Sequence, residues 1–313
     1  MKERVERLLA GDPRALARAI SLVEENAPAA VELLRSAYPH AGRATVLGIT
    51  GSPGAGKSSL VDRLVTRYRR DQERVGVVAV DPSSAYSGGA ILGDRVRMLD
   101  HSADAGVFIR SMATRGHLGG LCRAANDAID LMDAAGYDPV LVETVGVGQD
   151  EIDVVRTADV VAVVLVPGMG DDIQAIKAGI LEIADLFVIN KADRHGADRL
   201  QAELDYVLSL AESPDRPKPR IVRTIAVQDE GIEELRDAIE SFLAATADRR
   251  PDGRRRDRAE SRFLALLSER VTDRLLREVL GDGELERIVD AIARRERDPY
   301  SAVDAVLSRL EVR

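Results

Sequence analysis

Short runs of aliphatic residues, many of them β-branched, recur along most of the chain and alternate with amphipathic stretches. The runs are Thr45–Thr50, Val75–Val80, Val107–Ile109, Pro139–Val142, Val160–Val166, Leu186–Ile189 and Ile221–Val227. Because they lack polar alternation, we expect strands buried on both faces, as in a mostly parallel sheet covered by helices. This alternation predicts a doubly wound α/β fold, which binds its ligands at the carboxyl ends of the strands.

The pattern divides the chain into three parts: a helical N-terminal extension at residues 1–42, an α/β domain at residues 43–247 and a helical C-terminal arm at residues 248–313. In the extension, Asp12-Pro13 and Pro28 mark the starts of two helices, because proline suits the first helical position. An arginine-rich stretch from Ala247 to Arg258 is interpreted as a solvated linker rather than a nucleic-acid patch. The arm beyond it has an apolar helical stripe that must pack on its own domain or on a second subunit.

Composition narrows the class of protein. Hydrophobic residues make up 45% of the 313 residues, charged residues 31%, and the formal charge is −9. The negative charge argues against nucleic acid as the main ligand. The lone Cys122 excludes an intramolecular disulfide or a cysteine-based metal cage, and no apolar run reaches the roughly 18 residues of a membrane span. We therefore expect no membrane association and a cytoplasmic location.

The segment after the first predicted strand matches the phosphate-loop pattern G-x-x-x-x-G-K-[ST] at every fixed position, from Gly51 to Ser58. Glycines let successive backbone N–H groups point at phosphate oxygens, and the following helix adds its positive dipole end. Lys57 is expected to reach the β- and γ-phosphates, and the Ser58 hydroxyl to ligate Mg²⁺. The predicted nucleotide-binding residues of this loop are Gly51, Ser52, Pro53, Gly54, Ala55, Gly56, Lys57, Ser58 and Ser59.

A second motif, Asn190-Lys191-Ala192-Asp193, follows the buried run Leu186–Ile189 and matches N-K-x-D. Guanine carries an N1–H and an exocyclic amine on one edge, and the Asp193 carboxylate can accept hydrogen bonds from both. Adenine lacks that amine, so a site built on this pair rejects it strongly. Asn190 would brace the loop, and the Lys191 stem would lie over the ring. The motif favours GTP over ATP.

Acidic residues stand at two other predicted strand ends. Asp81 follows Val75–Val80 and Glu143 follows Pro139–Val142, so both carboxylates can support Mg²⁺ beside the phosphate loop. Glu143-Thr-Val-Gly146 stands where many GTPases have Asp-x-x-Gly, whose glycine amide senses the γ-phosphate. Asp94 is either a further metal and switch residue or an ordinary helix N-cap. The spacing of Lys177 fits a functional lysine and a solvated helix lysine equally well.

Taken together, these motifs resemble those of the MeaB/ArgK family of methylmalonyl-CoA mutase-associated GTPases. The resemblance runs through nearly the whole chain and includes Gly88–Met98, Arg115–Gly120, Glu143–Gln149 and Pro167–Asp172. It implies a homodimeric GTPase that binds GTP, GDP and Mg²⁺. It also implies a partner: the protein would escort a cobalamin-dependent acyl-CoA mutase, gate its cofactor loading and protect or reactivate it.

Residue roles carried over from the family begin with Lys57, Asp94, Glu143 and Lys177 as catalytic and coupling residues. Ser58, Asp81, Asp94 and Glu143 would form the metal shell. Gly146 would belong to the second switch. Asn190, Lys191, Asp193, Thr224 and Ala226 would contact the base. The chain departs from the usual Thr-Ser-Ala at Thr224-Ile225-Ala226, so a hydroxyl is missing while the Ala226 N–H remains.

Two other functions stay open from the sequence. A nickel metallochaperone GTPase shares this general architecture, but such proteins usually carry histidine-rich or cysteine-containing sites, and the four histidines here lack metal-ligand spacing. A P-loop kinase linked to amino-acid transport is the other alternative, against which the N-K-x-D motif argues.

Overall fold

The computed structural model describes residues 1–81, 101, 103–113, 120–144, 158–168, 183–210, 218–246, 253–281 and 283–309. The chain forms two compact units, Met1–Arg249 and Arg250–Arg313, each treated by itself below. Three of the predicted site residues lie outside the described residues: Asp94, Gly146 and Lys177.

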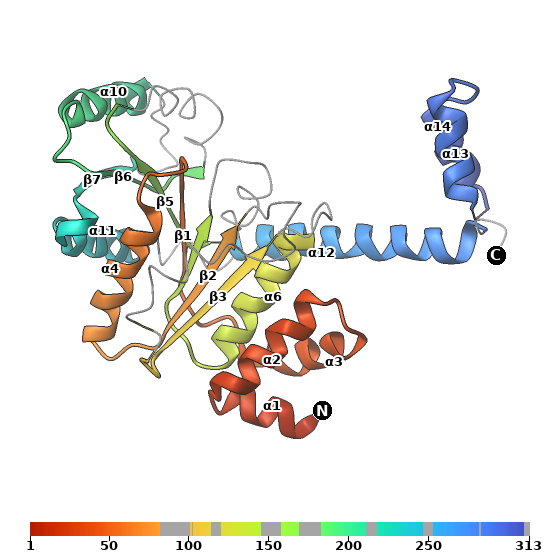
Figure 1. The fold of residues 1–313 in the computed structure, drawn as a ribbon, viewed down its shortest axis with the longest axis horizontal. Helices are drawn as coiled ribbons and strands as arrows, with labels where there is room; N and C mark the ends of the chain where they lie inside the picture. The colour runs from red at the N-terminus through yellow and green to blue at the C-terminus, as the bar shows by residue number, and fades with distance from the viewer. Residues whose placement is uncertain are drawn as a thin grey trace. The chain divides into compact units, whose positions relative to one another are not determined.

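The first unit is built on a parallel sheet. Within the described part of the chain it has seven strands in the order β3-β2-β4-β1-β5-β6-β7, every neighbouring pair parallel (Figure 1). The strands are β1 Val46–Gly51, β2 Val75–Asp81, β3 Val107–Ala113, β4 Val140–Thr144, β5 Val160–Leu165, β6 Leu186–Asn190 and β7 Arg220–Thr224. The predicted doubly wound α/β class is confirmed.

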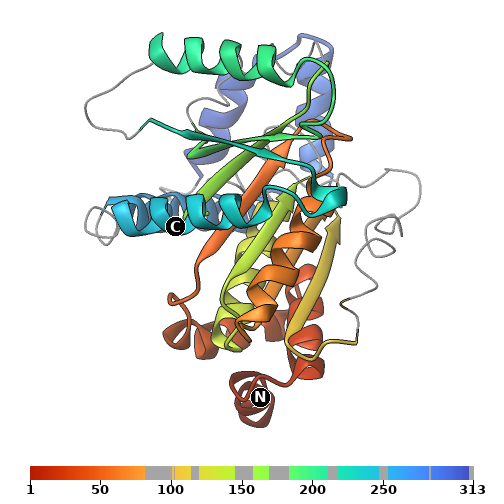
Figure 2. The same ribbon diagram turned by 90° about the vertical axis from the view of Figure 1, so that its left-hand side faces the viewer.

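Helices cover both faces of this sheet. They are α4 Lys57–Arg70, α6 Gly120–Ala134, α10 Ala197–Leu210 and α11 Ile232–Thr246. Side chains of α4 and α11 share one buried cluster, while those of α6 and α10 belong to the other. Figure 2 shows α4 and α11 on the viewer's side of the strands. Every residue of β1, β4, β5 and β6 is buried, which explains why their sequences lack polar alternation.

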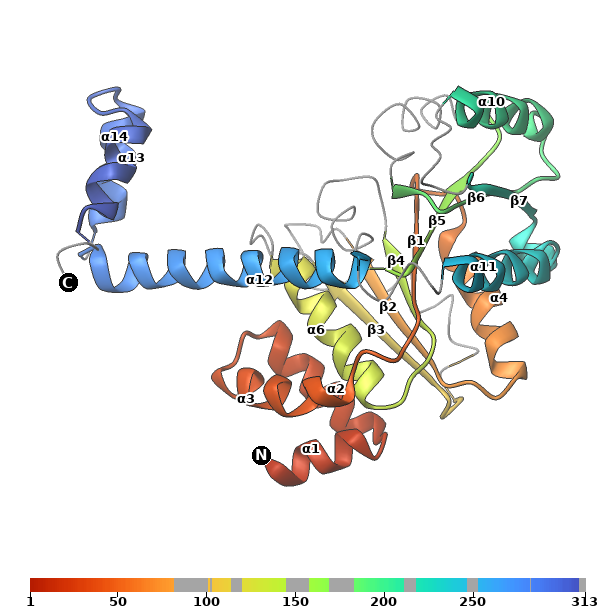
Figure 3. The same ribbon diagram turned by 180° about the vertical axis from the view of Figure 1, so that it is seen from behind.

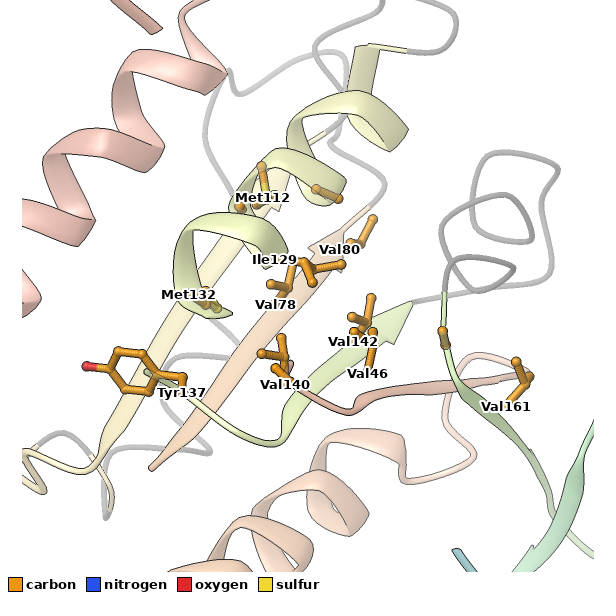
Figure 4. Close-up of a cluster of buried hydrophobic side chains, with 14 of the residues drawn as sticks. Val46, Val78, Val80, Met112, Ile129, Met132, Tyr137, Val140, Val142 and Val161 are labelled. Carbon is orange, nitrogen blue, oxygen red and sulfur yellow. The ribbon is translucent and has the colours of Figure 1, made fainter. Parts of the chain in front are cut away.

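The core on the α6 face is mostly aliphatic, as expected for a chain without tryptophan. Val78 and Val80 of β2 meet Val140 and Val142 of β4 under Ile129 of α6 (Figure 4). Tyr137 is fully buried at one end of this cluster, and the Arg74 guanidinium stacks 4.2 Å from its ring centroid. The continuous packing fixes the strand order and thereby the positions of the strand ends that carry the predicted motifs.

The N-terminal helices are α1 Lys2–Leu9, α2 Pro13–Glu24 and α3 Pro28–Ala37, followed by the short η1 Tyr38–His40. The predicted Asp12 cap is confirmed, since its carboxylate accepts from the N–H groups of Arg14 and Ala15 at 2.8 and 3.3 Å. These helices pack beside α6 (Figure 3) and join the same core. Arg110 of β3 also pairs with Glu24 of α2. The N-terminal helices therefore fold with the sheet as one unit.

A truncation in this extension should destabilise the whole unit. Leu16 of α2 is fully buried in the core shared with α6. Leu16→Ala is expected to lower the free energy of unfolding by about 2–5 kcal/mol, because it leaves a cavity. Leu210→Ala is the matched control, since Leu210 is 70% exposed, and it should change stability by no more than about 0.5 kcal/mol. Urea unfolding of the full chain measures both, and equal effects would contradict shared packing.

The end of β7 corrects one prediction. The run Ile221–Val227 was expected to be a single strand, but β7 ends at Thr224 and the short helix η4 Ala226–Gln228 follows. The physical reason is a tight turn. The N–H groups of Ile225 and Glu230 donate to each other's carbonyls at 3.0 and 3.3 Å, and Asp229 adopts a left-handed conformation with φ of 61°. The turn places the Ala226 N–H within hydrogen-bond distance of Asn190 at the end of β6.

The second unit is entirely helical where it is described. It contains α12 Gly253–Arg274, η5 Leu275–Val279, α13 Glu284–Ala293 and α14 Pro299–Leu307. A salt bridge of 2.8 Å between Arg309 and Glu284 ties the end of this unit to α13. Large apolar side chains on these helices are exposed: Phe263, Leu264, Leu267, Val271, Leu276, Leu285, Val289, Tyr300, Val303 and Leu307. A search of the described helices for one long and apolar enough to cross a membrane finds none.

Candidate functional site

The phosphate loop connects the end of β1 to the start of α4. Gly51, Gly54 and Gly56 all have positive φ angles, of 141°, 79° and 88°. A Cβ at Gly51 would lie 2.1 Å from the Val164 carbonyl oxygen, and one at Gly56 would lie 2.5 Å from Asn190 Nδ2. Glycine is therefore required at both positions by conformation and by space. The start of α4, which is the positive end of its helix dipole, lies beneath the resulting loop.

Lys57 is the first residue of α4 and lies under this loop. Its side chain points back, and Nζ donates to the carbonyl oxygens of Gly51 and Ser52 at 2.6 and 3.0 Å. The residue is buried, with 5% of its surface exposed. An ammonium held in this way lies beside the loop backbone, so it can move onto the oxygens of a phosphate bound in the loop.

The next residue, Ser58, contacts the acid at the end of β4. Ser58 Oγ donates to Glu143 Oε1 at 2.7 Å, and both side chains are buried. The next residue of β4, Thr144, donates from its Oγ1 to Thr50 Oγ1 of β1 at 2.9 Å. This pair of hydrogen bonds holds the end of β4 against the phosphate loop. A hydroxyl and a carboxylate side by side provide hard oxygen ligands that suit Mg²⁺. Water and phosphate oxygens would complete the coordination shell of such an ion.

Asp81 ends β2, beside β4 in the sheet. The register pairs Ala79 with Glu143 and Val80 with Thr144, so the Asp81 backbone lies just beyond Glu143 at the same carboxyl edge. The sequence-predicted acids thus end neighbouring strands, as a parallel sheet requires. Among the residues that the structure describes, no cluster of three or more His, Cys, Asp and Glu side chains forms a metal site made by protein alone.

Asn190 joins the base-reading motif to the phosphate loop. Its Nδ2 donates to the Ala55 carbonyl at 2.8 Å, across 135 residues of sequence. Its Oδ1 accepts from the Thr224 hydroxyl and from the Ala226 N–H, both at 3.1 Å. One buried amide therefore fixes three segments of the site: the phosphate loop, the end of β6 and the end of β7.

The neighbouring motif residues lie at the surface of the same region. Lys191 has a left-handed backbone, with φ of 55°, and its Nζ donates to the Gly54 carbonyl at 2.7 Å. The Lys191 side chain therefore spans from the base-reading loop to the phosphate loop. Asp193 is exposed two residues later, as a carboxylate that meets a ligand from solvent must be. The Ala226 N–H, expected to contact the base, already donates to Asn190.

The match to a protein-family model covers residues 16–280, and the family is described as methylmalonyl-CoA mutase-associated GTPase MeaB. The chain belongs to this family. It is 48% identical to a protein of Pyrococcus abyssi over 98% of this chain and 96% of that one. It is 36% identical to GTPase ArgK of Escherichia coli, with 92% and 88% of the two chains covered.

Two further comparisons agree with this membership. The mouse mitochondrial methylmalonic aciduria type A homolog is 42% identical over 63% of this chain and 48% of its own length. A crystal structure described as a LAO/AO transport system kinase superposes with a TM-score of 0.71 at 28% identity, covering 99% of this chain and 97% of that one. As a MeaB-family member the chain is a GTPase and binds guanine nucleotides.

Three residues around the site of this MeaB-family GTPase were missed by sequence reasoning. Thr50 and Thr144 form the buried hydroxyl pair below Ser58 and Glu143. Arg67 of α4 pairs with Asp229 in the turn after β7. Thr50 ends the predicted strand Thr45–Thr50 and Thr144 follows the predicted strand Pro139–Val142 by two residues, both beside motif residues, which is a usable signal. Nothing in the sequence signals Arg67, because its partner lies 162 residues away.

His101 makes a structural contact to α4. Its Nε2 lies 3.1 Å from Asp62 Oδ1, and both side chains are nearly buried. The hydrogen bond to Asp62 raises the pKa of His101 above its usual value of 6.5, burial acts in the opposite direction, and the Asp62 and Asp104 charges add to the increase. The ion pair thus joins the residue preceding β3 to the phosphate-loop helix.

This pair predicts a pH-dependent stability. A histidine whose pKa is raised by folding stabilises the native state fully below its unfolded pKa of about 6.5, and loses that contribution as the pH rises through the folded-state pKa. We therefore expect the stability difference between wild type and His101→Gln to be larger at pH 6 than at pH 9. Urea unfolding at a series of pH values measures it. A difference that does not change with pH would contradict the ion pair.

Proposed function

We propose that this GTPase binds GTP with Mg²⁺ at the phosphate loop and serves as a chaperone of a cobalamin-dependent acyl-CoA mutase in the cytoplasm. It would gate cofactor loading and protect or reactivate the mutase. The observation that carries the nucleotide part is the Asn190 side chain, which binds the phosphate loop and the base-reading turn at once. The family description, which names a methylmalonyl-CoA mutase, supports the partner.

The assignment of residues follows from the contacts already described. The loop from Gly51 to Ser59 would hold the phosphates, with Lys57 on the β- and γ-phosphate oxygens. The Asp193 carboxylate would accept from the guanine N1–H and amine. Thr224 would orient the Asn190 amide through its hydroxyl, and Ala226 would offer its N–H to the base carbonyl.

Ser58, Glu143 and Asp81 are the proposed metal-shell residues, together with Asp94. When bound, Mg²⁺ would neutralise charge that develops on the phosphate oxygens. The protein itself would orient the γ-phosphate with Lys57 and the loop N–H groups, so that water attacks in line with the leaving oxygen. Release of the γ-phosphate would then free the segment that carries Gly146 and change the surface seen by a partner.

The helical arm is the proposed dimerisation segment. Its exposed apolar side chains, such as Phe263, Leu267 and Val271 on α12, are spaced three or four residues apart and so share one face of the helix. A face of this kind on an arm supports burial against a second copy of the chain.

One rival function has an observation in its favour. The superposable structure at 28% identity is described as a transport system kinase. A kinase would pass the γ-phosphate to a second substrate, whereas the proposed activity releases it as inorganic phosphate. The bond from Asn190 to Ala55 does not discriminate between the two reactions, so phosphate release must be measured.

The partner is tested by titrating the purified GTPase with the cobalamin-dependent acyl-CoA mutase of the same organism. We expect saturable stimulation of GTP hydrolysis. Asp94→Ala and Lys177→Ala, at the proposed coupling positions, should reduce the stimulation, whereas exchange of the exposed Lys218 for alanine should not. Hydrolysis that ignores the mutase at every concentration would overturn the chaperone role and leave the GTPase activity in place.

A further inference from the structure

The turn that follows β7 has two anchors on opposite sides. It runs from Ile225 to Glu230 and closes on itself through the backbone pair described above. On the β6 side, Asn190 accepts from the Ala226 N–H. On the other side the turn reaches the phosphate-loop helix α4, with which η4 is in contact.

Arg67 of α4 makes the second anchor. Its Nη2 lies 2.6 Å from Asp229 Oδ2, and its Nε lies 3.5 Å from Glu233 Oε2 at the start of α11. Only 11% of the Arg67 side chain is exposed. Its partners are more exposed, Asp229 at 37% and Glu233 at 58%, so the contact depends on the planar guanidinium, which holds its partners in a defined geometry. Arg67 therefore fixes where the turn sits on α4.

The position of Arg67 on α4 gives this contact a consequence for the ligand. Lys57 begins the same helix, and Arg67 follows ten residues later, about 15 Å along the axis. A rigid helix thus connects the residue that meets the phosphates with the turn that meets the base. Ile225 has no side-chain polar atom, so only the backbone of this residue can stabilise the turn by hydrogen bonding.

We propose that Arg67 is a positioning residue for base selection: through Asp229 it holds the turn so that the Ala226 N–H, which donates to Asn190 Oδ1 at 3.1 Å, can be shared with the carbonyl at C6 of guanine. This inference rests on the proposed nucleotide site. Guanine and hypoxanthine both carry a carbonyl at C6, whereas adenine carries an amine there that cannot accept from Ala226. Displacement of the turn would therefore remove a hydrogen bond to guanine or hypoxanthine and would leave the binding of adenine unchanged.

The test compares the affinities of GDP, IDP and ADP, measured by competition against a fluorescent GDP. Arg67→Gln should weaken GDP and IDP by about tenfold each, roughly the loss of one hydrogen bond, and leave ADP unchanged. The GDP/ADP ratio therefore falls about tenfold. Arg67→Lys, which keeps the charge near Asp229, should restore part of the ratio.

A matched control is Arg236→Gln. Arg236 of α11 also pairs with α4, through Asp71 at 2.5 Å, and its side chain is 15% exposed. Asp71 caps the C-terminal end of α4 and is not part of the turn from Ile225 to Glu230, so loss of this pair should leave the GDP/ADP ratio unchanged even if it lowers stability. Equal weakening of GDP and ADP by Arg67→Gln, or an equal change of the ratio by Arg236→Gln, would overturn the inference.

Asp193→Asn separates failure of this inference from failure of the site. That variant should weaken GDP far more than Arg67→Gln does and remove the preference for GDP over IDP, because it changes the contact to the guanine amine. A normal GDP affinity in Asp193→Asn would overturn the proposed site and this inference together. A loss in Asp193→Asn with an unchanged ratio in Arg67→Gln would overturn the role of Arg67 alone.

Discussion

Replacing Lys57 by alanine is expected to lower the single-turnover rate of GTP hydrolysis by about 10²- to 10³-fold at saturating nucleotide. The ammonium lies under the phosphate loop, bonded to the carbonyls of Gly51 and Ser52. It is the described cation best placed to meet negative charge on the γ-phosphate oxygens. A neutral, shorter side chain removes this stabilisation from the transition state and weakens nucleotide binding as well.

Lys218→Ala is the control for this experiment, because Lys218 is exposed and precedes β7. It should hydrolyse GTP at the wild-type rate. Binding of a fluorescent GTP analogue, measured beside the rate, separates lost affinity from lost catalysis. A loss of rate of no more than about threefold in Lys57→Ala would be well short of the loss expected for a phosphate-binding lysine. That result would show that the phosphate loop does not hold the γ-phosphate.

Exchanging Asp193 for asparagine is expected to change the base that the protein selects. The carboxylate accepts from the guanine N1–H and amine, and its loss should weaken GTP binding roughly 10²- to 10³-fold. Xanthine carries a carbonyl where guanine has the amine, and an asparagine amide can donate to it while accepting from N1–H. XTP affinity should therefore rise by a similar factor.

A nearby carboxylate gives the matched control for that exchange. Asp198 of α10 is exposed and pairs with Arg223 at 2.8 Å. Asp198→Asn should alter neither GTP nor XTP affinity. Competition binding measures the affinities of wild type, Asp193→Asn and Asp198→Asn for GTP and XTP. Unchanged GTP affinity in Asp193→Asn would mean that another group reads the base.

The sequence predicted the strands well because burial on both faces leaves a plain signal of aliphatic, β-branched runs. It failed at Ile221–Val227, where the apolar run continues beyond the strand. Val227 is apolar but 75% exposed, and the chain turns because the backbone of Ile225 pairs with that of Glu230. Hydrophobic periodicity does not detect such a turn, since its stabilising bonds are made by the backbone.

The motifs of the site were also found from sequence, because each requires fixed residue types at short spacing. What the sequence could not supply is how the motifs meet. Ser58 contacts Glu143 across 85 residues, and Asn190 contacts Ala55 across 135. These contacts depend on the strand order, which brings β4, β1, β5 and β6 side by side. Strand order is a property of the packed sheet and has no local signature.

The most direct test of the account is the release of inorganic phosphate by the purified full chain, given GTP or ATP, with Mg²⁺ or with a chelator. The account predicts one phosphate released per GTP consumed, loss of activity with the chelator, and at least about 10³-fold slower release from ATP under the same conditions. Consumption of GTP without release of phosphate would favour the kinase instead. Equal hydrolysis of ATP would contradict base selection by Asp193, Asn190 and the turn at Ala226.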